Sequence, residues 1–137
     1  MTMRSSSDAA FNASVYTATM IYLGFLGGSN NAFYYFGGTS EAAPSWAAIT
    51  ADLDQARAYM GQATLGLFAP HLYNIASSSS YGSDFHDVTV GTNNDPAGAP
   101  SYSAGSGYDL PTGLGTPIVT GLLHSLATGV PYSLTMP

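Results

Sequence analysis

A serine lies where a run of aromatic residues gives way to a helix-like segment. The stretch YYFGGTSEAAPSWAAI, residues 34–49, carries Ser40 after two glycines and a threonine and before a run rich in alanine. A hydroxyl at such a junction lies at the positive end of the helix dipole, beside backbone N–H groups that can hold a developing oxyanion. Gly37 and Gly38 would let a substrate backbone approach closely. These residue types in this order suit a nucleophilic serine.

The local residues leave a second interpretation open, in which Ser40 only caps the helix, as serine commonly does. The Gly-x-Ser-x-Gly elbow of α/β-hydrolases does not fit, because its second glycine would stand at the position of Ala42. A subtilase-type general base does not fit either, since that histidine precedes the serine in the chain. Here all three histidines follow it: His71, His86 and His124.

No carboxylate is well placed by the sequence to take a proton from Ser40. Glu41 is its neighbour, but the side chain leaves the helix in another direction, and we expect it to complement the helix dipole. Asp52 and Asp54 lie several helical turns away at about 1.5 Å per residue, which is too remote. We therefore expect this chain alone not to hydrolyse peptides appreciably.

The composition excludes several classes of partner. Of the 137 residues, 7% are charged and 45% hydrophobic, and the net charge is -6 with Arg4 and Arg57 as the basic residues. Such a chain repels polyphosphate and anionic lipid, so we expect neither a nucleic-acid nor a membrane partner. Without cysteine there is no disulfide and no thiolate metal site. A surface with few ion pairs loses little when carboxylates protonate, which favours an acidic working environment.

The residues around the serine predict a hairpin and a long helix. Residues 15–26 and 31–36 are rich in β-branched and aromatic types and are separated by GGSN, which predicts a β-hairpin before the serine helix. Residues 41–60 have helical periodicity, and we expect the helix to begin at the serine or at the residue after it. Pro44 is tolerated in a first turn, and Gly61 is a suitable stop.

The second half of the chain predicts shorter elements and a long loop. A helix is expected over 69–76, a short strand over 85–91 and a final helix over about 117–128. Residues 92–117 are a Gly/Pro/Ser/Asn segment with too few apolar groups for regular structure. A loop of that length in a compact domain is usually functional or tied down by another group.

Four blocks of the sequence resemble a known family. GGTSEAAPSWAA resembles the serine motif of the sedolisins, the serine-carboxyl peptidases, and LYNIA, FHDVTVGTN and YSAGSGYDLPTGLGTP resemble later blocks in the same order, over about residues 33–123. The resemblance implies the C-terminal part of an α/β, subtilisin-like catalytic domain with a parallel sheet and flanking helices, and it makes Ser40 the nucleophile. It divides the chain into a nucleophile segment of about 15–76, a calcium-site loop region of about 84–117 and the C-terminal helix.

The resemblance also implies how the serine is activated. In the sedolisins a glutamate oriented by an aspartate replaces the histidine base, and another aspartate helps to hold the oxyanion. A carboxylate still accepts protons in acid, where an ordinary histidine is already protonated. These acidic residues precede the serine in the family pattern, in a part that this chain does not contain. We expect an acid-acting endopeptidase or tripeptidyl peptidase, with a peptide or protein substrate and the missing N-terminal part of the peptidase domain as partners.

One Ca²⁺ ion is implied on the long loop. Calcium takes about six to eight oxygen ligands, including carboxylates and backbone carbonyls, and glycines let carbonyls converge. The implied ligands are the carboxylates of Asp87 and Asp109 and the backbone carbonyls of Val88, Gly105 and Gly107. Without the resemblance, these residues fit a glycine-rich turn with the aspartates capping its ends.

An alternative function is a non-catalytic calcium-binding or interaction module that keeps the peptidase framework. The first residues, MTMRSSSDAAFNAS, are not followed by the apolar stretch of a signal peptide, and the apolar run 20–28 is too short to cross a bilayer. For the parent protein, the family implies an extracellular location or an acidic compartment.

Overall fold

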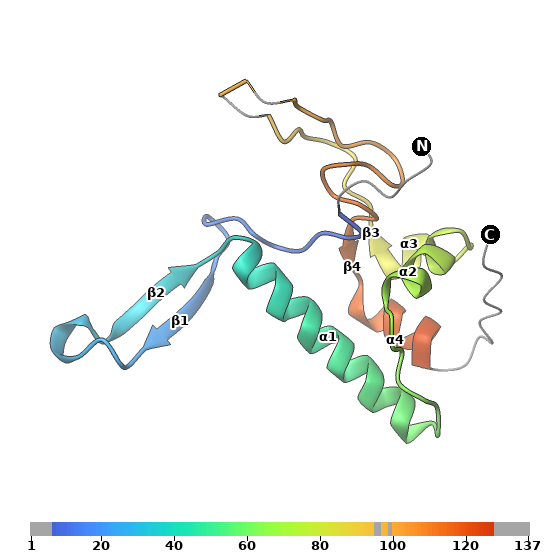
Figure 1. Cartoon of the computed structure of the whole chain (residues 1–137), viewed down its shortest axis with the longest axis horizontal. Coiled ribbons are helices and arrows are strands. Elements are labelled where there is room, and N and C mark those ends of the chain that lie inside the picture. The colour runs from blue at the N-terminus through green and yellow to red at the C-terminus, as the bar shows by residue number, and fades with distance from the viewer. Residues whose placement is uncertain (1–6, 95–96, 99, 128–137) are drawn as a thin grey trace. The chain divides into compact units, whose positions relative to one another are not determined.

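The computed structural model describes residues 7–94, 97–98 and 100–127, which belong to two compact units (Figure 1). One unit is Phe11–Ala48, and the other comprises Met1–Ala10 with Ile49–Pro137. Among the helices of the described residues, none has the length and hydropathy needed to cross a membrane.

The unit Phe11–Ala48 is built on the predicted hairpin. Strand β1 (Thr19–Leu23) pairs antiparallel with β2 (Ala32–Phe36), and a short 3₁₀ turn, η1 (Gly28–Asn30), lies between them. The first strand begins later than the sequence indicates. The side chain of Asn12 explains this, because its oxygen accepts a hydrogen bond from Thr17 Oγ1 at 2.8 Å and its nitrogen donates to the Thr17 carbonyl at 2.8 Å. This polar turn holds the preceding residues out of the ladder.

Helix α1 (Thr39–Tyr59) begins one residue before the serine. Gly38 precedes it with φ +90°, a conformation that favours glycine, and its carbonyl accepts the Glu41 N–H at 2.9 Å. Pro44 lies beyond the first turn, contrary to expectation, so the carbonyl of Ser40 lacks the usual donor four residues on. The helix ends before Gly61, as predicted.

The other unit packs short elements around an aliphatic core. Its elements are the later part of α1, α2 (Ala69–Ala76), α3 (Tyr81–Asp84), β3 (Phe85–His86), β4 (Thr116–Pro117) and α4 (Val119–Ala127). The buried apolar side chains include Leu53, Leu72, Ile75, Phe85, Leu114, Leu122 and Leu126. Within this unit Arg57 also connects α1 to the segment after it and to α4. Its Nε donates to the Ala63 carbonyl at 2.7 Å, and its Nη1 donates to the Leu126 carbonyl.

The predicted elements of this half are present, one with the expected bounds and two shorter than expected. The helix over 69–76 is confirmed, and the final helix covers 119–127, with residue 128 outside the described residues. The strand expected over 85–91 is only Phe85–His86, paired antiparallel with β4. It stops there because the next side chain, Asp87, binds the backbone of the long loop instead. Both strand pairs of the described residues are antiparallel, so the parallel sheet stays a prediction.

Candidate active site and cation site

Ser40 is the second residue of α1, and its side chain is exposed. The position before the helix belongs to Gly38, so the hydroxyl does not serve as the N-cap. Within the described residues, no hydrogen bond engages the Ser40 hydroxyl. An exposed hydroxyl at a helix N-terminus can reach a bound carbonyl group.

The two glycines before the serine differ in their surroundings. A Cβ at Gly37 would come within 3.2 Å of the backbone of Ser14 and Val15, so this glycine accommodates the chain itself. A Cβ at Gly38 would meet only the Ser40 nitrogen, at 4.0 Å. Of the two, Gly38 therefore leaves open space near the hydroxyl.

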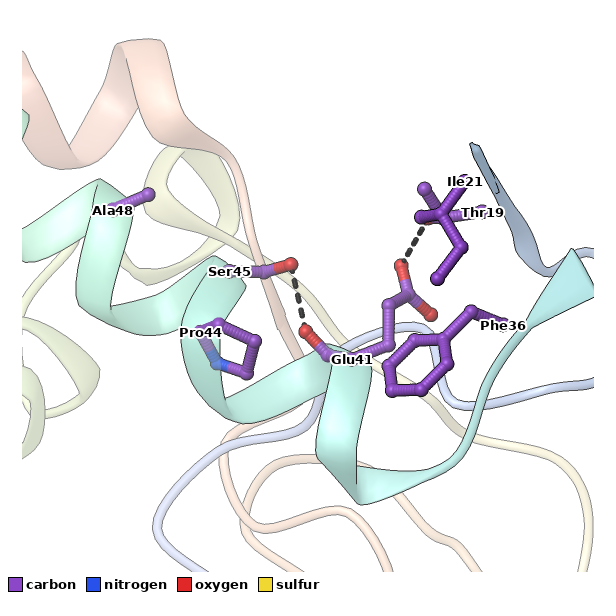
Figure 2. A pocket seen from close by; sticks show the side chains of 7 residues that line it. All are labelled: Thr19, Ile21, Phe36, Glu41, Pro44, Ser45 and Ala48. Atoms are coloured by element: carbon purple, nitrogen blue, oxygen red, sulfur yellow. Dashed lines mark hydrogen bonds between the residues drawn. The ribbon is translucent and has the colours of Figure 1, made fainter. Parts of the chain in front are cut away.

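Glu41 is buried, which the sequence did not indicate. It lies in the first turn of α1 with 8% of its surface exposed. Its Oε1 accepts a hydrogen bond from Thr19 Oγ1 on β1 at 2.8 Å, whereas Oε2 is enclosed and has no partner among the described residues. Figure 2 shows the carboxylate extending from the helix toward the strand, with the Phe36 ring beside it. Because Thr19 and Glu41 are distant in the chain, no local pattern reveals this contact.

A pocket of about 390 Å³ lies between the start of α1 and the hairpin, wholly within the unit Phe11–Ala48. The lining residues are Thr19, Ile21, Phe36, Glu41, Pro44, Ser45 and Ala48 (Figure 2). Apart from two hydroxyls, one of which, Ser45 Oγ, donates to the Glu41 carbonyl at 2.9 Å, the walls around the carboxylate are apolar.

The second constellation contains Asp87, Gly105, Gly107 and Asp109, which hydrogen bonds connect in two pairs through the glycine N–H groups, not through the carbonyls expected to bind calcium. Gly107 N–H donates to Asp87 Oδ2 at 2.8 Å, and Gly105 N–H donates to Asp109 Oδ2 at 2.9 Å. Gly107 has φ +76°, so glycine suits the tight curl of this loop. Val88 follows Asp87 in the chain, but no described contact places its carbonyl in the cluster.

The carboxylates of Asp87 and Asp109 both contribute to a raised pKa of Tyr81. Burial, followed by the charge of Asp87 and then that of Asp109, raises the pKa of Tyr81 to about 12. Burial tends to raise the pKa of Asp109, but hydrogen bonds from Gly105 and Thr112 outweigh it and lower that pKa. The Tyr81 hydroxyl donates to the Leu114 carbonyl at 3.1 Å. Tyr81 follows a run of serines, and no pattern in the sequence indicates that it lies near the two aspartates.

These residues fit a hard divalent cation in part. Asp87 Oδ1 is enclosed and has no hydrogen-bond partner among the described residues, so it can serve as a ligand. The other carboxylate oxygens of the pair accept hydrogen bonds from the loop. The described residues contain no group of three or more His, Cys, Asp or Glu side chains that could hold a metal ion. Backbone carbonyls or water would have to complete the coordination.

The chain is similar in sequence to several peptidases. It is 40% identical to tripeptidyl-peptidase sed1 of Aspergillus fumigatus over 87 residues, which cover 64% of this chain and 12% of that protein. It is 35% identical to tripeptidyl-peptidase SED1 of Arthroderma otae over 114 residues, 83% of this chain and 15% of that protein. Kumamolisin of a Bacillus species is 40% identical over 90 residues, 66% of this chain and 15% of that protein. The chain thus spans only 12% to 15% of the length of these relatives.

A solved structure shares the fold. The structure of Pseudomonas sedolisin, a serine-carboxyl proteinase in complex with two molecules of pseudo-iodotyrostatin, matches with a TM-score of 0.70 and 31% sequence identity. The match covers 89% of this chain and 29% of that one. No family model matches the chain.

Proposed function

Because this chain is a homologue of the sedolisins, the serine-carboxyl peptidases, we propose that it carries the nucleophile of an acid-acting peptidase. The observation that carries the proposal is the position of Ser40. Its hydroxyl is exposed in the first turn of α1, and Gly38 rather than the serine occupies the N-cap. In this position the hydroxyl is available for attack on a peptide carbonyl carbon.

Ser40 would form the acyl-enzyme bond, and its proton would pass to a carboxylate. The positive end of α1 and its first N–H groups favour the negative charge that develops on the substrate oxygen. Gly38 leaves space for the substrate backbone. The proton acceptor, a glutamate oriented by an aspartate, would come from the large part of the relatives' length that this chain does not span. The chain alone is therefore inactive, and the remainder of the peptidase domain is its partner.

One Ca²⁺ ion would stabilise the long loop at Asp87 and Asp109, together with the carbonyls of Val88, Gly105 and Gly107. The enclosed Asp87 Oδ1 supports this assignment, because an ionised oxygen without any partner is costly to bury. When bound, the ion would neutralise two carboxylates that lie near one tyrosine. The parent protein would act outside the cell or in an acidic compartment, where a carboxylate base remains competent.

A non-catalytic calcium-binding or interaction module is the second candidate. It is favoured by the hydrogen bonds that hold Asp87 and Asp109 within the loop, whereas the described residues show no base beside the serine. The two candidates differ in whether the Ser40 hydroxyl reacts.

Peptide hydrolysis tests the proposal. The purified chain is incubated with a peptide mixture at about pH 4, near ordinary carboxyl pKa values, alone and together with the part of kumamolisin that this chain does not match. We expect turnover only in the combined sample, and none with Ser40→Ala. Turnover by the chain alone that Ser40→Ala abolishes would contradict its incompleteness. Turnover by the combined sample that survives Ser40→Ala would exclude Ser40 as the nucleophile.

A further inference from the structure

Glu41 is an isolated buried charge. It is the only charged residue between positions 11 and 48, and that segment contains no histidine, lysine or arginine. Its side chain is 8% exposed, and Thr19 satisfies only Oε1. The other oxygen, Oε2, is enclosed and has no partner among the described residues. A carboxylate removed from water is unfavourable unless it is paired, so this arrangement calls for a cation or a strong donor.

This chain offers no described cation for Glu41. Of its two basic residues, Arg4 lies outside the described residues. Arg57 is engaged within the other unit, where it donates to the carbonyls of Ala63 and Leu126. The partner of Glu41 can come from the remainder of the peptidase domain or from a ligand, and the pocket beside Glu41 favours a ligand.

The pocket around Glu41 indicates the kind of ligand. Ile21, Phe36, Pro44 and Ala48 give it apolar walls, and its volume of about 390 Å³ is sufficient for a side chain. Apolar walls with one carboxylate suit a cation carried on an aliphatic stem. The Phe36 ring, which lies beside the Glu41 side chain in Figure 2, adds an aromatic face that attracts a cation.

We propose that this pocket, defined by Thr19, Ile21, Phe36, Glu41, Pro44, Ser45 and Ala48, binds the lysyl side chain of a peptide. An ammonium group is a point charge, whereas a guanidinium binds best through both oxygens of a carboxylate, and Thr19 already occupies one of them. Phe36 is 39% exposed, and lysyl binding through Oε2, which is enclosed, would require the Phe36 side chain to move. Ser40, which directly precedes Glu41 in the chain, does not line this pocket. That the peptide is a substrate rests on the proposed function, whereas lysyl binding does not.

Binding of a small probe tests the pocket. The whole chain is titrated with Nα-acetyl-lysine N-methylamide and with the norleucine analogue, which has the same stem without the ammonium group, and binding is followed by calorimetry and by NMR. We expect the lysine probe to bind at least about tenfold more tightly than the norleucine probe, as a charge-assisted hydrogen bond implies. Glu41→Gln should abolish this preference. Asp52→Asn, which removes an exposed carboxylate from the same helix, should keep it.

Circular dichroism establishes that each variant is folded. If Glu41→Gln does not fold, Phe36→Leu replaces it, and loss of the aromatic face should weaken lysine binding while norleucine binding changes little. Equal binding of the two probes by the unaltered chain, no binding of either, or an undiminished preference in the folded variant would overturn the proposal. Ser40→Ala separates this result from the proposed function, because it should abolish hydrolysis by the combined sample and leave lysine binding intact.

Discussion

Removal of the charge at position 109 tests the cation site. Asp109 accepts three hydrogen bonds, from Gly105 N–H at 2.9 Å, Thr112 N–H at 2.8 Å and Thr112 Oγ1 at 2.9 Å. Asp109→Asn keeps the shape and the oxygen that faces Thr112. It replaces the acceptor for Gly105 with an amide group that cannot accept, and it removes one of the two charges that would hold Ca²⁺.

The expected size of the effect follows from binding linkage. A ligand present at a hundredfold excess over its Kd stabilises the folded state by about 2.7 kcal/mol, which for a chain of this size raises Tm by roughly 10 °C. Thermal unfolding followed by circular dichroism at neutral pH, in calcium and in chelator, measures this difference. We expect the increase for the unaltered chain and for the surface variant Asp52→Asn, and its loss in Asp109→Asn. No difference between calcium and chelator in the unaltered chain, or an equal one in Asp109→Asn, would refute the site.

Three further predictions concern stability. Because hydrogen bonds lower the pKa of Asp109, its ionised form stabilises the fold above the ordinary carboxyl value of about 3.9. In chelator, the Tm advantage of the unaltered chain over Asp109→Asn should therefore be present at neutral pH and shrink as the pH falls below about 4; a pH-independent difference would contradict this. Leu53 is fully buried, so Leu53→Ala should lower the free energy of unfolding in urea by about 2–5 kcal/mol, and a loss well below 1 kcal/mol would show that the site is not packed as described. A methyl group at Gly121 would overlap the Ser83 carbonyl, so Gly121→Ala should lower the free energy of unfolding in urea by about 1–3 kcal/mol. Gly82→Ala is the control, because its Cβ would meet nothing, and it should not destabilise the chain. Equal effects of the two substitutions would contradict the close approach of α4 to α3.

Local patterns predicted the elements around the serine. The aromatic and β-branched runs on either side of a glycine-rich turn form the β1/β2 hairpin, and the segment with helical periodicity after Ser40 lies in α1. The helix over 69–76 was predicted with its observed bounds. These features follow from propensities that act over a few residues, which is why the sequence alone was sufficient.

Contacts between distant residues were not predictable in the same way. Buried Glu41 binds Thr19, 22 positions earlier, and the elevated pKa of Tyr81 depends first on burial and then on Asp87 and Asp109 across a loop. The strand after Phe85 was predicted too long, because alternation of side chains does not show that the Asp87 carboxylate turns to bind the Gly107 N–H. For the loop, it was the family resemblance that brought the two aspartates together in the prediction.

The most direct test of the nucleophile is covalent labelling. The chain is treated with a fluorophosphonate reagent, alone and combined with the complementary part of kumamolisin, and the modified residue is located by tandem mass spectrometry. The proposed function predicts modification at Ser40 in the combined sample, little or none in the chain alone, and none in Ser40→Ala. Modification of a different residue, or equal labelling of Ser40→Ala, would contradict it.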